Sequence, residues 1–239
     1  MRRADSEAKP PIDRPAISKD RFDLVIFDCD GVLIDSEVLS CSVLRRQLAR
    51  HGMPIELDEI FTRYLGHAFS VVSEDFARVC GRPIPESFLP DLKADLFATF
   101  GRELRRIPAI ETVLESLELP YCLTSSSDRE RLEVSLRVTG LARYFEGRIY
   151  NAEMVARGKP APDLFLFAAG RMGLLPARAL VIEDSVTGVL AGKAAGMTVW
   201  GFIGGSHYAG RDGAPMLTEA GADRIFQDMT DIEIFPRRT

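Results

Sequence analysis

Short apolar runs alternate with helical patterns along most of this chain, and this alternation limits the possible folds more than any other feature. Apolar runs of strand length occupy residues 22–27, 121–124, 179–182, 198–203 and 222–226. Apolar residues at helical spacing occupy 109–119, 129–138, 163–172 and 185–195. Strands that alternate with helices of this length are typical of a parallel sheet with helices on both faces. We therefore predict an α/β fold, a Rossmann-like parallel sheet.

The alternation is interrupted after the first strand. Residues 37–105 contain consecutive amphipathic helical patterns, at 38–51, 57–65, 71–81 and 89–102. This stretch is too long for a simple crossover between neighbouring strands, so we predict an inserted α-helical cap domain over 37–105. The α/β core domain would then comprise 21–36 and 106–232. Residues 1–20 combine prolines with many charges and are predicted to be a disordered extension, and 233–239 a C-terminal tail.

Composition excludes several classes of partner. The formal net charge of −5 gives no attraction to nucleic acid or to an anionic membrane surface, and no apolar run has the length of a membrane span. The four cysteines show no CxxC or Cys/His metal-ligand spacing, which favours a reduced, cytoplasmic setting. We expect a small-molecule partner and a monomer or small homo-oligomer.

Two pairs of acids directly follow predicted strands. Asp28 and Asp30 come after the first strand, and Glu183 and Asp184 come after the strand at 179–182. Function in an open parallel sheet gathers at the carboxyl ends of the strands, and paired carboxylates there favour a bound cation such as Mg²⁺. The structural alternatives are turn formation by Asp and Gly for the first pair and helix N-capping for the second.

Candidate phosphate-binding residues follow two further elements. Thr124 to Ser127 form a hydroxyl-rich turn between a strand and a helix, where they offer donors to a phosphate or cap the helix. Lys159 stands between Gly158 and Pro160 on a stiff loop, which can aim its ammonium at a fixed anion. Together with the acids, these residues supply the parts of a phosphoryl-transfer site.

On these residues the chain resembles the haloacid dehalogenase superfamily, in the phosphatase branch with a helical cap that includes β-phosphoglucomutase-like and phosphoglycolate phosphatase-like members. Three segments carry the resemblance: 28–36 (DCDGVLIDS), 158–163 (GKPAPD) and 182–188 (IEDSVTG). The 28–37 segment and the later run GFIGGSH at 201–207 are also similar to bacterial sugar-phosphate phosphatases, including the 6-phosphogluconate type.

The resemblance implies a role for each site residue. Asp28 attacks phosphorus and forms an aspartyl phosphate, and Asp30 protonates the leaving oxygen and then activates water. The phosphoryl-binding residues are Ser125, the amide of Ser126 and Lys159. Mg²⁺ is bound by Asp28, the Asp30 carbonyl and Asp184, with Glu183 as a direct or indirect partner. The implied activity is a Mg²⁺-dependent hydrolysis of a phosphate monoester, with a sugar phosphate or sugar-acid phosphate as substrate; the sequence does not separate Mg²⁺ from Mn²⁺.

Four alternatives compete with this prediction. A phosphomutase of the β-phosphoglucomutase type carries a histidine ten residues beyond the second Asp, where this chain has Ser40. A phosphonate hydrolase uses a cap lysine, and Lys93 is the only lysine of the predicted cap. Dehalogenases lack the second acid, Asp30, and a non-catalytic binding protein of the same fold would lack at least one motif residue, yet all are present.

Substrate choice is expected to depend on the cap. The loop at 65–69 contains Gly66, which permits a tight turn, and we predict that His67 or Phe69 contacts the substrate. Packing of the loop is the alternative. His207 lies in a glycine-rich loop, where a position at the loop surface is expected.

Overall fold

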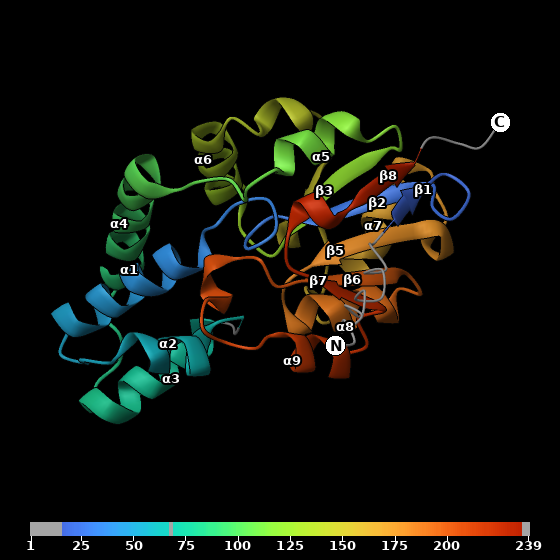
Figure 1. The fold of residues 1–239 in the computed structure, drawn as a ribbon. Coiled ribbons are helices and arrows are strands. Elements are labelled where there is room, and N and C mark those ends of the chain that lie inside the picture. The colour runs from blue at the N-terminus through green and yellow to red at the C-terminus, as the bar shows by residue number, and fades with distance from the viewer. Residues whose placement is uncertain (1–15, 67–68, 236–239) are drawn as a thin grey trace, which may run out of the picture.

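A six-stranded parallel sheet forms the centre of the molecule. The computed structural model describes residues 16–66 and 69–235. The strand order is β4-β3-β2-β5-β6-β7, which confirms the predicted fold class (Figure 1). The strands are β2 (Leu24–Asp28), β3 (Tyr121–Ser125), β4 (Ile149–Asn151), β5 (Ala179–Glu183), β6 (Thr198–Phe202) and β7 (Arg224–Phe226). The short strand β4 was not predicted, because its three residues give no readable pattern.

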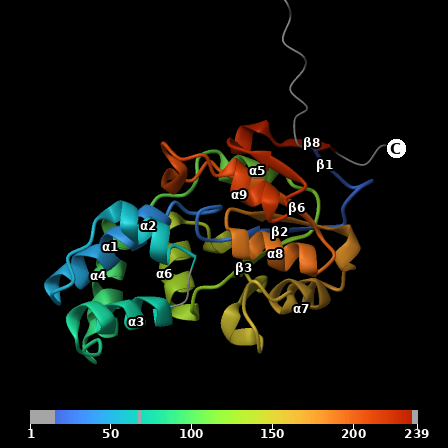
Figure 2. The same cartoon turned by 90° about the horizontal axis from the view of Figure 1, so that it is seen from below.

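Helices cover both faces of the sheet, and the alternation of side chains along β2 shows how (Figure 2). Val25 and Phe27 belong to one hydrophobic cluster, with residues of α5 (Ile110–Ser116) and α6 (Arg129–Thr139). Leu24 and Ile26 belong to a second cluster, with residues of α7 (Asp163–Met172), α8 (Val186–Ala194) and α9 (Ala214–Glu219). All four side chains are fully buried, as expected for a central parallel strand that is apolar on both faces.

Four helices occupy the predicted insert between β2 and β3. They are α1 (Glu37–Arg50), α2 (Leu57–Tyr64), α3 (Phe69–Cys80) and α4 (Phe88–Glu103), and they lie together beside the sheet in Figure 1. They form a hydrophobic cluster of their own that includes Leu48, Ile60, Phe76 and Phe88. Among the described residues, no helix has the length and apolar character needed to cross a membrane.

The two ends of the described chain differ from the prediction. Residues 1–20 were expected to be disordered and 233–239 to form a tail, yet β1 (Ala16–Ser18) pairs in parallel with β8 (Glu233–Phe235). The side chain of Ile17 is 1% exposed and belongs to the cluster on the α5 face. Three-residue strands at opposite ends of a chain stabilise each other only after the fold brings them together, so neither is visible in the sequence.

Short 3-10 turns complete the connections between these elements. They are η1 (Ala142–Tyr144), η2 (Ala152–Met154), η3 (Pro176–Arg178), η4 (Ser206–Tyr208) and η5 (Met229–Asp231). The turn η4 follows β6 and lies near α1 of the insert.

Candidate active site

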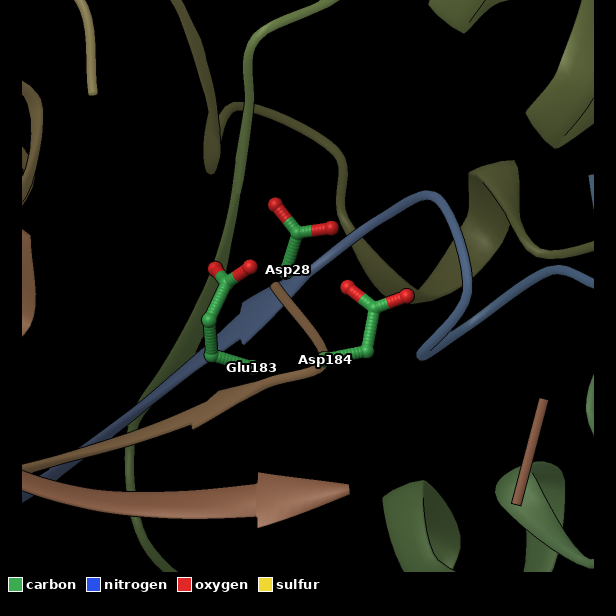
Figure 3. Close-up of side chains that lie close together, drawn as sticks. All are labelled: Asp28, Glu183 and Asp184. Atoms are coloured by element: carbon green, nitrogen blue, oxygen red, sulfur yellow. The ribbon is translucent and has the colours of Figure 1, made fainter. Parts of the chain in front are cut away.

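Three carboxylates meet where the central strands β2 and β5 end. The two strands pair with Phe27 opposite Ile182, so Asp28 and Glu183 leave the sheet side by side. Asp184 completes the group, and each of the three acids has a carboxylate oxygen within 4.8 Å of the others (Figure 3). All three side chains are buried. The structure thus brings Asp28 together with Glu183 and Asp184, which follow a different strand in the sequence.

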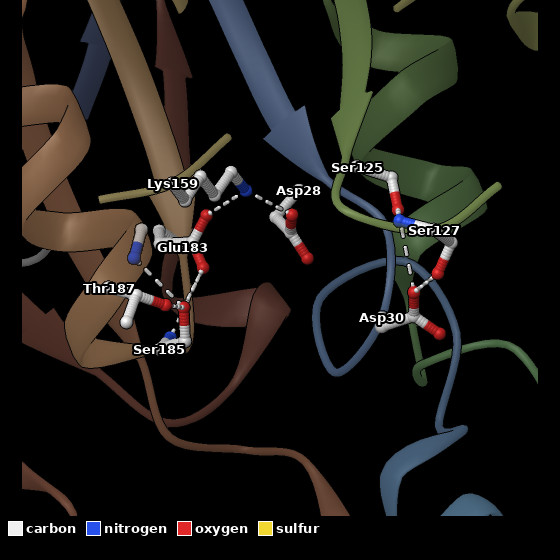
Figure 4. A network of polar contacts seen from close by, with 9 residues as sticks. Asp28, Asp30, Ser125, Ser127, Lys159, Glu183, Ser185 and Thr187 are labelled. Carbon is white, nitrogen blue, oxygen red and sulfur yellow. Dashed lines mark hydrogen bonds and ion pairs between the residues drawn. The ribbon is translucent and has the colours of Figure 1, made fainter. Parts of the chain in front are cut away.

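Lys159 lies between two of these acids. Its Nζ is 2.5 Å from Asp28 Oδ1 and 2.7 Å from Glu183 Oε2, and its side chain is only 3% exposed (Figure 4). The ammonium also lies 4.9 Å from the centre of the Phe165 ring at the start of α7. Burial alone would lower the pKa of Lys159, but the carboxylates of Asp28 and Glu183 raise it, so the lysine stays charged.

The charges of this group favour an additional cation. Three buried carboxylates share the space with one ammonium. Burial, and next the negative charge of Glu183, raise the pKa values of Asp28 and Asp184 well above their ordinary range. A divalent cation would supply the missing positive charge, and carboxylate oxygens are the ligands that Mg²⁺ prefers. The residues present therefore fit the predicted metal.

Two glycines leave the space that these carboxylates occupy. A Cβ added to Gly31, whose φ is +78°, would lie 1.7 Å from Asp184 Oδ2. A Cβ added to Gly188 in α8 would lie 1.9 Å from the carboxyl carbon of Glu183. The glycines of the 28–36 and 182–188 motifs are thus required by the close approach of the backbone to the acids.

Asp30 is surrounded by donors. Its carboxylate accepts hydrogen bonds from Ser36 Oγ at 2.6 Å, Ser127 Oγ at 2.7 Å and the Arg131 guanidinium at 2.7 Å. Ser125 Oγ lies 3.5 Å from the same carboxylate. Burial would raise the pKa of Asp30, but Arg131 and the hydroxyl donors together lower it, so the group is ionised.

The turn after β3 supplies more than was predicted. Ser125 is buried at the end of the strand and accepts a hydrogen bond from the backbone N–H of Ser127. Ser126 lies between them and is exposed. Sequence reasoning placed Ser127 in the hydroxyl-rich turn but did not predict its bond to Asp30, and it missed Arg131. The signal for Arg131 was its place three residues after the helix cap Asp128, which keeps it in the first turn of α6 and close to the end of β3.

Two residues at the start of α1 also face this region. Ser40 stands where a phosphomutase would carry its histidine, and its hydroxyl lies 3.1 Å from the Arg131 guanidinium. Burial, and next the charge of Asp30, raise the pKa of Glu37 to about 7. Neither contact was predicted from the sequence.

His207 was expected at a loop surface, but the structure buries it. Its side chain is 3% exposed, and its Nε2 lies 3.3 Å from Asp184 Oδ2. Burial lowers the pKa of His207 to about 4, so the imidazole is neutral. The sequence could not show this, because the turn after β6 contacts Asp184 only once the sheet places β6 beside β5.

The predicted substrate loop is described only in part. His67 lies outside the described residues. Phe69 is partly buried and packs against the hydrophobic cluster of the insert, with a ring-centre distance of 5.9 Å to Phe88. This packing accounts for Phe69, and its contact with substrate stays a prediction. Lys93 on α4 forms ion pairs with Asp128 and Glu130 of the core, as a surface lysine would.

Comparisons with known proteins relate the chain to a family of hydrolases. A model of the haloacid dehalogenase-like hydrolase family matches residues 22–196. The chain is 27% identical to a 6-phosphogluconate phosphatase of Escherichia coli strain K12, over 78% of this chain and 85% of that protein. It is 31% identical to a phosphorylated carbohydrates phosphatase of Thermotoga maritima, over 84% of this chain and 92% of that protein.

A solved structure shows the same likeness in three dimensions. A HAD family hydrolase from Deinococcus radiodurans R1, with bound phosphate and sodium, is 38% identical, with a TM-score of 0.73, and the match covers 88% of this chain and 93% of that one. The family model spans both the first acidic motif and the Glu183–Asp184 pair. With its fold, its buried acids and these relatives in agreement, this chain belongs to the haloacid dehalogenase-like hydrolase family, in the phosphatase branch.

Proposed function

We propose that this chain is a Mg²⁺-dependent phosphatase that hydrolyses a small sugar phosphate or sugar-acid phosphate through an aspartyl phosphate on Asp28. The observation that carries the proposal is the buried group in which Lys159 holds one oxygen of Asp28 while Glu183 and Asp184 stand beside it. The named activities of the Escherichia coli and Thermotoga maritima relatives support the substrate class.

Asp28 is suited to nucleophilic attack because only one of its oxygens is occupied. Lys159 donates to Oδ1, and among the described residues no hydrogen bond reaches Oδ2. Oδ2 would attack phosphorus, and the bond from phosphorus to the ester oxygen would break. Lys159, shared with Glu183, would neutralise part of the charge on the transferring phosphoryl group. Ser125 and the amide of Ser126 would bind that group from the end of β3.

Asp30 would act on the leaving group and then on water. In this structure it is ionised and held by Ser36, Ser127 and Arg131. The carboxylate is the form that accepts a proton from water when the aspartyl phosphate is hydrolysed, whereas the protonated form is required to release the alcohol.

The metal would be held by Asp28, Asp184 and the Asp30 carbonyl, with Glu183 close by. When bound, it would supply positive charge against the phosphoryl oxygens and the acids.

A panel of sugar phosphates, sugar-acid phosphates and one aryl phosphate tests the proposal. Phosphate release should require Mg²⁺ and should stop on addition of a chelator. Asp28→Asn should abolish it, and Asp30→Ala should reduce it at least about 100-fold, the scale of general acid–base catalysis. The control Glu118→Gln, an exposed acid paired with Lys19, should match the wild type. Turnover that persists in Asp28→Asn would overturn the mechanism, and folded wild type without activity on any ester would overturn the function.

A further inference from the structure

One turn after β6 contacts the carboxylate and the backbone of the same acid. In η4, His207 Nε2 lies 3.3 Å from Asp184 Oδ2. The hydroxyl of the next residue, Tyr208, donates a hydrogen bond to the Asp184 backbone carbonyl at 2.5 Å. Two adjacent side chains thus contact Asp184, one at its carboxylate and one at its backbone carbonyl. None of the roles given above uses either of them.

The imidazole of His207 is enclosed on several sides. A Cβ added to Gly31 would lie 3.1 Å from His207 Cε1, and one added to Gly205 would lie 2.7 Å from it. The ring of Tyr208 packs against the imidazole with 4.2 Å between ring centres. Because two glycine backbones and an aromatic ring surround it, the imidazole has little freedom to turn away from Asp184.

The hydrogen-bonding groups indicate the direction of the contact. Among the described residues, His207 Nδ1 is buried without a hydrogen-bond partner. Nε2 is the ring nitrogen that faces the Asp184 carboxylate, so it is the nitrogen placed to donate an N–H to that acceptor. A carboxylate with one oxygen held by an N–H is fixed in orientation and presents its remaining lone pairs to a metal.

The turn is itself fixed to the segment that leads into the insert. The backbone N–H and the Oγ of Ser206 both donate to Asp35 Oδ1, at 2.9 and 2.8 Å. Further along, Arg211 pairs with Asp58 of α2 at 2.5 Å and lies over the ring of Phe61. Residues that precede and follow His207 and Tyr208 in the chain are therefore held by contacts to Asp35 and to α2.

We propose that His207 and Tyr208 are positioning residues, which hold the Asp184 carboxylate and backbone in the orientation that binds the metal. This inference rests on the proposed metal-dependent function. It concerns the affinity of the empty enzyme for the ion, and it does not depend on which ester is the substrate.

Binding of Mn²⁺ to the full-length protein without substrate tests the inference, with free Mn²⁺ measured by electron paramagnetic resonance. His207→Leu keeps an apolar filling of the space but loses the N–H, and we expect the Kd for Mn²⁺ to rise about tenfold, the range seen when partners of metal ligands are removed. His207→Gln, which places an N–H near the former Nε2, should recover most of the affinity. The matched control His51→Leu changes a histidine of the insert that packs on Phe88, and its Kd should stay within about twofold of the wild type.

Tyr208→Phe provides a second test that removes a single oxygen atom. Its Kd should rise about fivefold, as for the loss of one hydrogen bond, and this variant still tests the positioning role of the turn if His207→Leu does not fold. Wild-type affinity in a folded His207→Leu, or equal weakening in His207→Leu and His207→Gln, would overturn the role of His207. Wild-type affinity in Tyr208→Phe would overturn that of Tyr208.

The variant Asp184→Asn distinguishes a failure of the positioning role from a failure of the proposed metal requirement. If it loses Mn²⁺ binding while the His207 and Tyr208 variants keep it, only the positioning role fails. If the wild type itself binds no Mn²⁺, the metal requirement of the proposed function fails as well.

Discussion

The tightest contact in the site gives a prediction whose size follows from the structure. In Gly31→Ala the new Cβ would lie 1.7 Å from Asp184 Oδ2, whereas ordinary contact begins at about 3.4 Å. The carboxylate would have to retreat by about 1.7 Å, and displacements of about 1 Å in an active site can reduce turnover about 100-fold. We therefore expect Gly31→Ala to lose at least about 100-fold in kcat for release of phosphate, and to bind Mn²⁺ weakly.

Gly140 provides the matched control for this substitution. Its φ of +73° is close to the +78° of Gly31, but a Cβ there would meet nothing within 4 Å. Both alanine variants should lose about 1–2 kcal/mol of unfolding free energy from the left-handed backbone, measured by urea denaturation. Only Gly31→Ala should lose activity. Wild-type turnover in a folded Gly31→Ala would refute the steric argument, and equal losses of activity in both variants would assign the effect to backbone strain.

Three further predictions concern the buried lysine, the pairing of the chain ends and the arginine beside Asp30. Lys159→Met should reduce kcat at least about 100-fold, because it removes the donor to Asp28, whereas the partly exposed Lys193→Met should stay within about twofold in the same steady-state assay. Ile17→Ala should lower the free energy of unfolding, measured by urea denaturation, by about 2–4 kcal/mol. Leu175, whose side chain is 70% exposed, is the control, and Leu175→Ala should lower it by less than about 0.5 kcal/mol. Equal losses would contradict the burial of β1. Arg131→Met should lower kcat about tenfold through the lost bond to Asp30, and an unchanged kcat would show that this bond does not serve the reaction.

Local patterns were sufficient for the long elements of the fold. Strands β2 and β5 are apolar up to the acids that end them, Asp28 and Glu183, since both faces are buried, and this pattern is readable in one sequence. The three-residue strands β1, β4 and β8 are too short for any pattern, and they depend on partners that are distant in the chain.

The sequence by itself determined that the acids Asp28, Glu183 and Asp184 stand where strands end, and that Lys159 stands on a stiff loop before a helix. For the acids this sufficed because parallel strands in one sheet end at the same edge, whichever strands lie between them in the chain. Only the tertiary structure decided what surrounds these groups. His207 contacts Asp184, 23 positions earlier in the chain. No local pattern encodes this contact, because it exists only once the turn after β6 packs next to Gly31.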